Sequence, residues 1–195
     1  MTTMPAVLPR YTPEEYLALE RAAEYKSEYI DGHIYAMSGG TKRHSLIKVA
    51  LVRLIDTHLL DSHCATLDSD MRVRVDPSLY TNPDLTVVCG EPEVEDVEDD
   101  TLLNPTAIFE VLSPSTEAYD RGEKWARYRR MPSLKQYVLV SQDKPRIEVY
   151  TRQGDVWTFS DAGGLDASIH LESIGCTLAL AEVYRRVGGG AGGEP

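Results

Sequence analysis

Residues 107–116 read AIFEVLSPST and decide the fold of this 195-residue chain. Six residues that are apolar except for Glu110 are typical of a buried β-strand. The Ser-Pro-Ser-Thr that follows ends this strand and predicts a helix over about residues 117–131. Two more apolar runs, DLTVVC at residues 84–89 and QYVLV at residues 136–140, predict further buried strands. Helices that alternate with strands in this way pack against one sheet.

The rest of the chain follows the same alternation. Asp31-Gly32 is a strong hairpin-turn dipeptide, so the residues around it predict a β-hairpin. The expected elements are a helix over residues 13–23, the hairpin over 25–38, an amphipathic helix around 47–55, a strand over 66–75 and a second hairpin over 147–159. We therefore expect an α/β (α+β) fold with a mixed central β-sheet flanked by helices, an N-terminal helix and hairpin, and a C-terminal β-hairpin.

Composition and length predict one globular domain. Hydrophobic residues make up 42% of the chain and charged residues 26%. We assign residues 1–187 to that domain, and the glycine-rich residues 188–195 to a flexible tail. Uncharged stretches are no longer than about ten residues, whereas a membrane helix needs roughly 20. No signal peptide is recognisable, so we expect a cytoplasmic protein without membrane contact.

The cysteines and histidines show no ligand spacing. Cys64, Cys89 and Cys176 lie far apart, without a CxxC pair. Their sparse, odd number predicts buried reduced thiols rather than a disulfide framework or a zinc site. Four of the five histidines have no metal-ligand spacing (His33, His58, His63 and His170). Residues 39–42, GGTK, lack the spacing of a phosphate loop, and we expect no organic cofactor.

The net charge of −11, with 31 acids against 20 Lys and Arg, argues at first against a nucleic-acid binder. Seven of those acids lie in residues 91–100, EPEVEDVEDD, which predict a solvated, self-repelling loop. Residues 121–135 hold six bases and one acid. Because the charges are unevenly distributed, the net value does not exclude DNA.

Two acids stand where a charge is costly to bury. Asp84 begins one predicted strand, and Glu110 lies inside another. If the strands are neighbours, the two carboxylates converge and form a hard-oxygen site suited to Mg²⁺ or Mn²⁺. The alternative is that Asp84 caps a turn and Glu110 pairs with a nearby arginine.

The helix that follows Glu110 adds a cation. Asp120, Lys124 and Tyr128 recur every four residues on one helical stripe. One interpretation is an ordinary surface ion pair between Asp120 and Lys124. The other is that Lys124 reaches back towards the carboxylates, because only a short turn separates the strand from the helix.

These motifs together resemble a known family. NPDLTVV (82–88), the 25 residues between Asp84 and Glu110, FEVLSPST (109–116), Lys124 and KQYVLV (135–140) are similar to the PD-(D/E)xK nuclease superfamily. More narrowly, they resemble its restriction-endonuclease-like (Uma-type) bacterial branch, which also has an E-x-x-x-G hairpin and a downstream histidine, as in residues 27–47 here. The resemblance spans roughly residues 12–185 and implies a restriction-endonuclease-like core.

The resemblance implies roles for individual residues. Asp84 and Glu110 match the metal-binding acids of the motif, the Val111 carbonyl is a further ligand, and Glu28 matches the hairpin acid that completes the metal shell. The motif's lysine falls at Leu112 here, and Lys124 fits the migrated position seen in this branch. The implied activity is Mg²⁺- or Mn²⁺-dependent hydrolysis of phosphodiester bonds in DNA.

Three basic residues are weaker candidates for substrate binding: His44, Arg121 and Arg127. A capping or core role is as plausible for His44. Leu112 at the motif's lysine position favours an alternative function, a catalytically decayed nuclease fold that binds nucleic acid or protein. A plain interaction module is a third hypothesis. We expect a homodimer, because such nucleases commonly pair and homodimers are the commonest oligomers.

Overall fold

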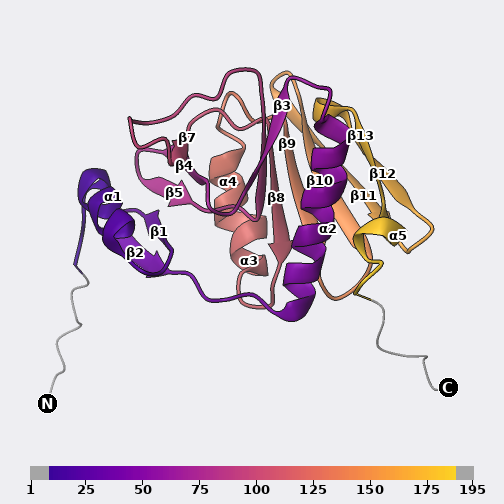
Figure 1. Ribbon diagram of the computed structural model, residues 1–195, viewed down its shortest axis with the longest axis horizontal. Coiled ribbons are helices and arrows are strands. Elements are labelled where there is room, and N and C mark those ends of the chain that lie inside the picture. The colour runs from indigo at the N-terminus through magenta and orange to yellow at the C-terminus, as the bar shows by residue number, and fades with distance from the viewer. Residues whose placement is uncertain (1–8, 188–195) are drawn as a thin grey trace, which may run out of the picture.

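A computed structural model describes residues 9–187 of the protein. Its elements form three layers (Figure 1). A central six-stranded sheet has the order β11-β10-β9-β8-β6-β3, and β8 and β9 run parallel while its other neighbours are antiparallel. Its strands are β3 (Cys64–Asp68), β6 (Leu85–Cys89), β8 (Ala107–Leu112), β9 (Gln136–Ser141), β10 (Arg146–Gln153) and β11 (Val156–Gly163).

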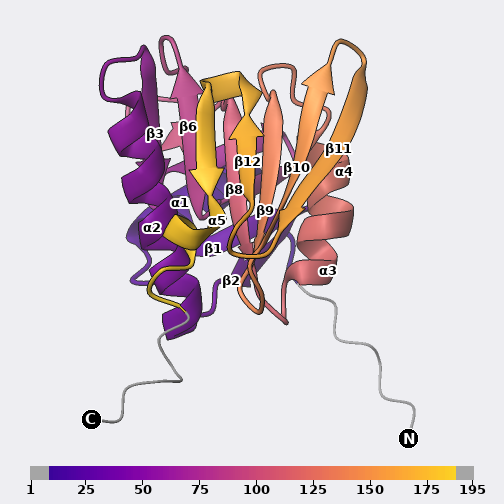
Figure 2. The same ribbon diagram turned by 90° about the vertical axis from the view of Figure 1, so that its right-hand side faces the viewer.

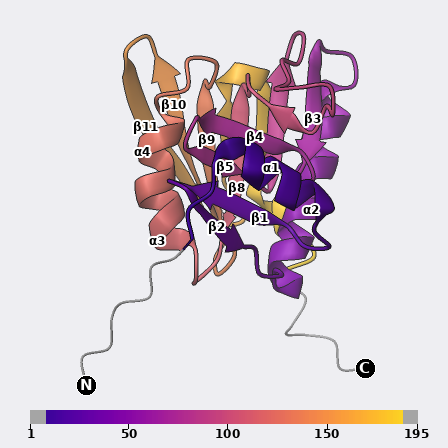
Figure 3. The same ribbon diagram turned by 90° about the vertical axis from the view of Figure 1, so that its left-hand side faces the viewer.

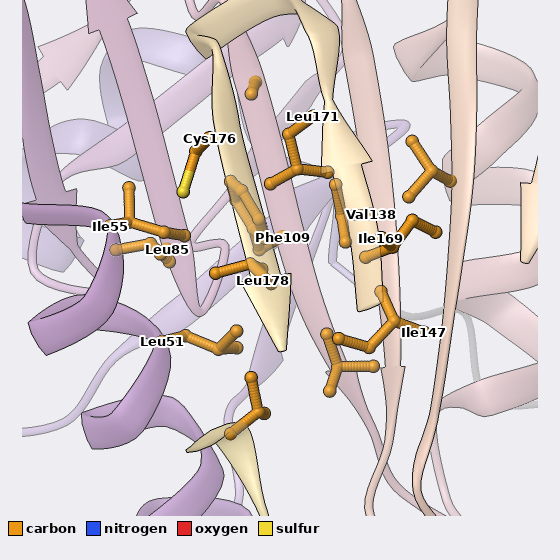
Figure 4. Close-up of a cluster of buried hydrophobic side chains, with 14 of the residues drawn as sticks. Leu51, Ile55, Leu85, Phe109, Val138, Ile147, Ile169, Leu171, Cys176 and Leu178 are labelled. Atoms are coloured by element: carbon orange, nitrogen blue, oxygen red, sulfur yellow. The ribbon is translucent and has the colours of Figure 1, made fainter. Parts of the chain in front are cut away.

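One face of the central sheet is covered by helix α2, the short hairpin β12–β13 and helix α5 (Figure 2). Alternating side chains of β6, β8 and β9 point into this layer and meet the apolar stripe of α2, as Figure 4 shows for Leu51, Ile55, Leu85 and Phe109. The bounds are α2 (Lys42–Leu59), β12 (Ser168–Leu171), the 3₁₀ turn η2 (Glu172–Ile174), β13 (Cys176–Ala179) and α5 (Leu180–Val183).

The other face meets a second sheet and a helical segment (Figure 3). The second sheet has the order β2-β1-β5-β4-β7, and α1 packs on it through a cluster of tyrosines. The elements of this layer are α1 (Pro13–Ala22), β1 (Ser27–Ile30), β2 (His33–Ala36), β4 (Arg72–Asp76), β5 (Leu79–Thr81), β7 (Thr101–Leu102), α3 (Glu117–Tyr119), the π-helix η1 (Asp120–Lys124) and α4 (Trp125–Tyr128).

The predicted fold class is confirmed, and several elements match their predicted bounds. Strand β8 covers residues 107–112 as expected, and α1 begins at Pro13 behind a Thr12–Glu15 capping box. The N-terminal hairpin turns at Asp31-Gly32, and the C-terminal hairpin joins the central sheet as β10–β11. Residues 188–195, predicted to be a tail, lie outside the described residues. No helix within residues 9–187 is long and apolar enough to cross a membrane.

Two predicted elements are wrong in their extent. The single strand over residues 66–75 is two strands, β3 and β4, which belong to different sheets. Asp68 separates them, because its carboxylate accepts the Asp70 N–H and its carbonyl accepts the Met71 N–H in a tight turn. The helix predicted over residues 117–131 ends at Tyr128 and contains a π-helical segment. Strands β5, β7, β12 and β13 were not predicted, because they are only two to four residues long.

The acidic segment of residues 91–100 is mostly exposed, as predicted, but three of its acids form ion pairs. Arg21 of α1 binds both Asp96 and Asp100, at 2.9 and 2.8 Å. Arg74 of β4 binds Glu95 at 2.8 Å. The arginines come from distant parts of the chain, so the local sequence could not reveal them. These ion pairs hold the segment against α1 and the second sheet, and they offset the repulsion between its acids.

The prediction for the cysteines is wrong in one respect. Cys64 and Cys89 lie directly opposite each other on β3 and β6 and form a disulfide. Cys176 is a free thiol buried in the core of Figure 4, as predicted. The pairing arises because β3 joins β6 at the edge of the sheet, which the spacing of the cysteines does not indicate.

Candidate active site

Two neighbouring strands bring Asp84 and Glu110 to one end of the central sheet. Strands β6 and β8 are antiparallel, with Leu85 opposite Phe109. Asp84 precedes the first residue of β6, and Glu110 lies towards the end of β8. The antiparallel register therefore places both residues at the same end of the sheet. The Val111 N–H donates a hydrogen bond to Asp84 Oδ2 at 2.8 Å, which fixes the aspartate beside β8.

Glu110 is a buried acid held by two donors. Its Oε1 lies 2.9 Å from Lys124 Nζ and accepts a hydrogen bond from the Tyr128 hydroxyl at 3.1 Å. Burial raises the pKa of Glu110 to about 8; the ammonium of Lys124 opposes this, whereas the charges of Asp120 and Asp84 reinforce it. A carboxyl in this state responds strongly to any cation that enters the site.

Lys124 stands among three carboxylates from three elements. Its Nζ lies 3.1 Å from Glu28 on β1, 2.9 Å from Glu110 on β8 and 3.6 Å from Asp120 on η1. Burial alone lowers the pKa of Lys124, but these carboxylates outweigh it and hold the pKa well above its ordinary value. The lysine therefore stays charged.

The π-helix η1 presents Asp120 and Lys124 to the interior. Both side chains are buried, and burial raises the pKa of Asp120. Wider helical turns of this kind are frequent at functional sites. The four-residue spacing of Asp120, Lys124 and Tyr128 is thus the stripe of a buried site, and the surface-pair interpretation is wrong. The spacing is visible in the sequence, but Asp120 and Tyr128 were not predicted as site residues.

Helix α2 places His44 in contact with Asp84. Thr41 caps the helix and accepts the His44 N–H at 3.1 Å, which places the imidazole in the first turn. His44 Nε2 lies 3.1 Å from Asp84 Oδ2. One turn later Lys48 follows on the same side of α2, and its Nζ donates to Ser69 Oγ at 3.1 Å.

These residues line one cleft of about 1140 Å³. Its floor carries Glu28, Asp84, Glu110, Asp120 and Lys124, and its rim includes Lys26, His44 and Lys48. The exposed acids Asp31 and Glu123 also line the cleft, so charges of both signs lie above its acidic floor. Lys26 was not predicted as a site residue, and no local motif marks it.

The carboxylates of the cleft floor are ligands of the type that binds a divalent cation. Four carboxylates face one buried ammonium, so negative charge exceeds positive charge, and carboxylate oxygens are the ligands that Mg²⁺ and Mn²⁺ prefer. Both contacts of Asp84 use Oδ2, and among residues 9–187 no hydrogen bond uses Oδ1. In this arrangement Lys124 occupies the position between Glu28 and Glu110.

The other predicted site residues are placed differently. Val111 lines the cleft through its backbone. Arg121 lies outside it and pairs with Glu117 and Glu148. Arg127 also lies outside the cleft, and its guanidinium binds Asp31 at 2.6 Å. The structure therefore brings together Glu28, Asp84, Glu110, Lys124, Val111 and His44, and it separates the two arginines from them. Their substrate role stays a prediction.

Comparison with known proteins gives a consistent result. Residues 13–181 match the family Uma2, described as "Putative restriction endonuclease". Two proteins of Synechocystis sp. are similar in sequence. "Uncharacterized protein slr1290" is 40% identical over 182 residues, covering 92% of this chain and 94% of that protein. "Uncharacterized protein sll1609" is 35% identical over 160 residues, covering 81% and 90%.

A crystal structure from Anabaena variabilis, described as a putative nuclease belonging to DUF820, shares the fold. The TM-score is 0.75 at 20% identity, and the match covers 91% of this chain and 99% of that one. A likeness at this identity bears on architecture, and it confirms the mixed α+β arrangement with helices on the central sheet.

Proposed function

The chain belongs to the Uma2 family, and we propose that it hydrolyses phosphodiester bonds in DNA with the help of Mg²⁺ or Mn²⁺. The observation that carries this proposal is the position of Lys124, within 3.1 Å of Glu28 and Glu110, in the same cleft as Asp84. Buried carboxylates and one fixed ammonium at the bottom of a cleft that Lys26 and Lys48 also line suit a phosphate diester and a cation together.

Asp84 and Glu110 would hold the ion, with Glu28 and the Val111 carbonyl as further ligands. A bound divalent cation supplies a Lewis acid that polarises a phosphoryl oxygen. Lys124 offsets the charge that develops on the phosphate, and its contacts with two glutamates keep its amine in place. His44 orients Asp84 through their 3.1 Å contact.

Position 112 carries leucine in place of the motif's lysine, but the site still contains a lysine ammonium. Leu112 is buried in the apolar cluster on the face of the sheet that carries Tyr128. Lys124 reaches the carboxylates from the next helical segment instead. This geometry supports catalysis over the alternative, a decayed nuclease fold that only binds nucleic acid.

The rim supports DNA as the substrate. Lys48 Nζ donates to the Ser69 hydroxyl, and Lys26 Nζ donates to the Ser69 carbonyl and also pairs with Asp70. Ammonium groups at a cleft edge neutralise backbone phosphates, so binding should weaken steeply with salt. His44 stands between this rim and Asp84.

A nicking assay on supercoiled plasmid tests the proposal. Wild-type protein should nick DNA with Mg²⁺ or Mn²⁺ and not with EDTA, and Glu110→Gln and Asp84→Asn should each lose at least ~100-fold in rate. Glu98→Gln makes the same chemical change at an exposed acid outside the cleft and should leave the rate unchanged. Equal nicking by Glu110→Gln and wild type would refute the assignment. DNA binding without nicking by wild type would favour the decayed alternative.

We also propose a homodimer formed through the C-terminal hairpin. Strand β11 is an edge of the central sheet, and Val156 and Phe159 on it are 61% and 53% exposed. Apolar side chains on an unpaired edge strand favour pairing with a second copy. Light scattering after size exclusion should give a dimer mass for wild type and a monomer mass for Phe159→Lys. A monomeric wild type would contradict the proposal.

A further inference from the structure

A second group of potential metal ligands lies far from the cleft, at the edge of the central sheet. Within residues 9–187, the one set of three His, Cys, Asp or Glu residues whose ligand atoms all lie within 4.8 Å of one another is His63, Cys64 and Cys89. Both cysteines are partly exposed and His63 is exposed. Figure 2 shows β3 beside β6 at this edge.

Backbone contacts hold the three residues together. Cys64 and Cys89 are direct cross-strand partners of β3 and β6. Next to them, the Gly90 N–H donates to the His63 carbonyl at 2.9 Å. The Cys64 N–H donates to Ser62 Oγ at 3.0 Å, in the turn that connects α2 to β3. These contacts fix the backbone of His63 next to the two cysteines, from where its imidazole reaches the sulfurs.

The ligand types select a soft or borderline cation. Two thiolates and an imidazole are a common partial shell for Zn²⁺, and carboxylate-preferring Mg²⁺ binds such donors poorly. A tetrahedral ion at a Zn–S distance of about 2.3 Å keeps its two sulfurs roughly 3.8 Å apart. Side chains of facing cysteines span that separation by rotation about χ1. The exposed fourth position is left for water or an external ligand.

We propose that, once reduced, His63, Cys64 and Cys89 bind one thiophilic divalent cation such as Zn²⁺, and that this state and the Cys64–Cys89 disulfide exclude each other. The structure shows the disulfide state. Reduction needs a dithiol: two electrons and two protons pass to the S–S bond, which breaks into two thiols, while the dithiol forms its own disulfide. The incoming ion then displaces the two thiol protons into water.

Cobalt titration of the full-length protein tests the proposal. Protein reduced with a dithiol and freed of it under argon should bind one Co²⁺ per chain, with the near-ultraviolet absorption of a thiolate–cobalt bond, and Zn²⁺ should abolish that absorption. Protein with the disulfide intact should show none. Thiol counting in denaturant establishes the state, with three thiols expected after reduction and one before.

Variants identify the ligands. Cys89→Ser should lose the thiolate absorption, and His63→Ala, at an exposed position that the fold tolerates, should weaken Co²⁺ affinity at least ~10-fold. Cys176→Ala is the matched control, because it removes the buried thiol outside the group and should change nothing. The proposal is overturned if reduced wild type shows no thiolate–cobalt absorption. It is also overturned if His63→Ala binds like wild type, or if the disulfide form binds equally well.

Discussion

The two ends of strand β6 carry two ligand sets of opposite character. Asp84 precedes the strand and belongs to a cleft of carboxylates around Lys124. Cys89 ends the strand and belongs with His63 and Cys64 at an exposed edge. The first set consists of hard oxygens, and the second contains soft sulfurs.

The two ends of β6 differ in the charges that surround the ligands. In the cleft, Lys124 neutralises part of the carboxylate charge from inside the protein, and burial keeps Glu110 largely protonated below about pH 8. At the other end no charged side chain of the described residues is salt-bridged to His63, and the sulfurs are neutral as a disulfide. An ion entering the cleft must therefore compete with a lysine and protons. An ion at the edge must compete with a covalent bond.

The largest effect should come from removing the internal cation. Lys124→Met removes the ammonium shared by Glu28, Glu110 and Asp120 and leaves Glu110 with the Tyr128 hydroxyl as its remaining donor, so the free energy of unfolding should fall by about 3–5 kcal/mol at pH 8. Cleavage should fall at least ~100-fold, whereas Mn²⁺ affinity should rise, because the ion no longer competes with the ammonium for Glu28 and Glu110. Denaturant unfolding and calorimetric titration measure these quantities.

Lys135→Met is the control for Lys124→Met, because this lysine is exposed and lies outside the cleft. It should leave both stability and cleavage unchanged. Normal turnover in Lys124→Met would remove the lysine from the mechanism, and unchanged stability would show that the ion pairs contribute little.

The next largest effect should be a dependence of stability on pH that comes from the buried carboxyls of the cleft. Glu110 keeps its proton to about pH 8 in the folded chain but loses it near its ordinary value of 4.5 when unfolded. Between these values the folded state binds more protons, so the free energy of unfolding falls as pH rises, by at most about 1.4 kcal/mol per unit. The raised pKa of Asp120 acts in the same direction.

Urea unfolding at pH 5, 6, 7 and 8 should therefore show a steeper decline for wild type than for Glu110→Gln, which carries no titrating proton at this position. Mn²⁺ affinity of wild type should increase over the same range, because an ion needs the ionised carboxylate. Parallel stability profiles for the two proteins would contradict the raised pKa of Glu110.

Part of the fold and of the candidate site could be predicted from the sequence. Asp84 and Glu110 were predictable as neighbours because each lies in an apolar strand pattern, and two such strands pair. Lys124 followed from a short connection. The positions of Arg121 and Arg127 outside the cleft were not predictable, because basic composition does not reveal ion-pair partners: Glu148 and Asp31 come from a distant strand and a distant turn. The contact of Cys64 with Cys89 depends on the register of β3 with β6, which no local pattern encodes.

A smaller effect should come from the hydroxyl that holds Glu110. Tyr128 donates to Glu110 Oε1 at 3.1 Å and contacts Thr81 Oγ1 at 2.8 Å, in a fully buried position. Tyr128→Phe keeps the ring and leaves the threonine unpaired, so stability should fall by about 1–2 kcal/mol. Thermal denaturation with a fitted enthalpy measures the loss. Tyr25→Phe, at an exposed tyrosine, is the control. No loss in Tyr128→Phe would mean that water satisfies both partners.

The smallest expected effect tests whether the two ends of β6 are independent. Asp84 and Cys89 are five residues apart, which is about 16 Å along an extended strand and beyond the Debye length of about 8 Å at physiological salt. Breaking the disulfide by Cys89→Ser should therefore leave the metal-dependent nicking rate within about twofold, although it abolishes the proposed cobalt site. The comparison is made on reduced and oxidised wild type in parallel, since reduction alone removes the same bond without a substitution. A tenfold change in nicking rate both in Cys89→Ser and in reduced wild type, each compared with oxidised wild type, would show that the disulfide holds β6, and with it Asp84, in the geometry that cleavage requires.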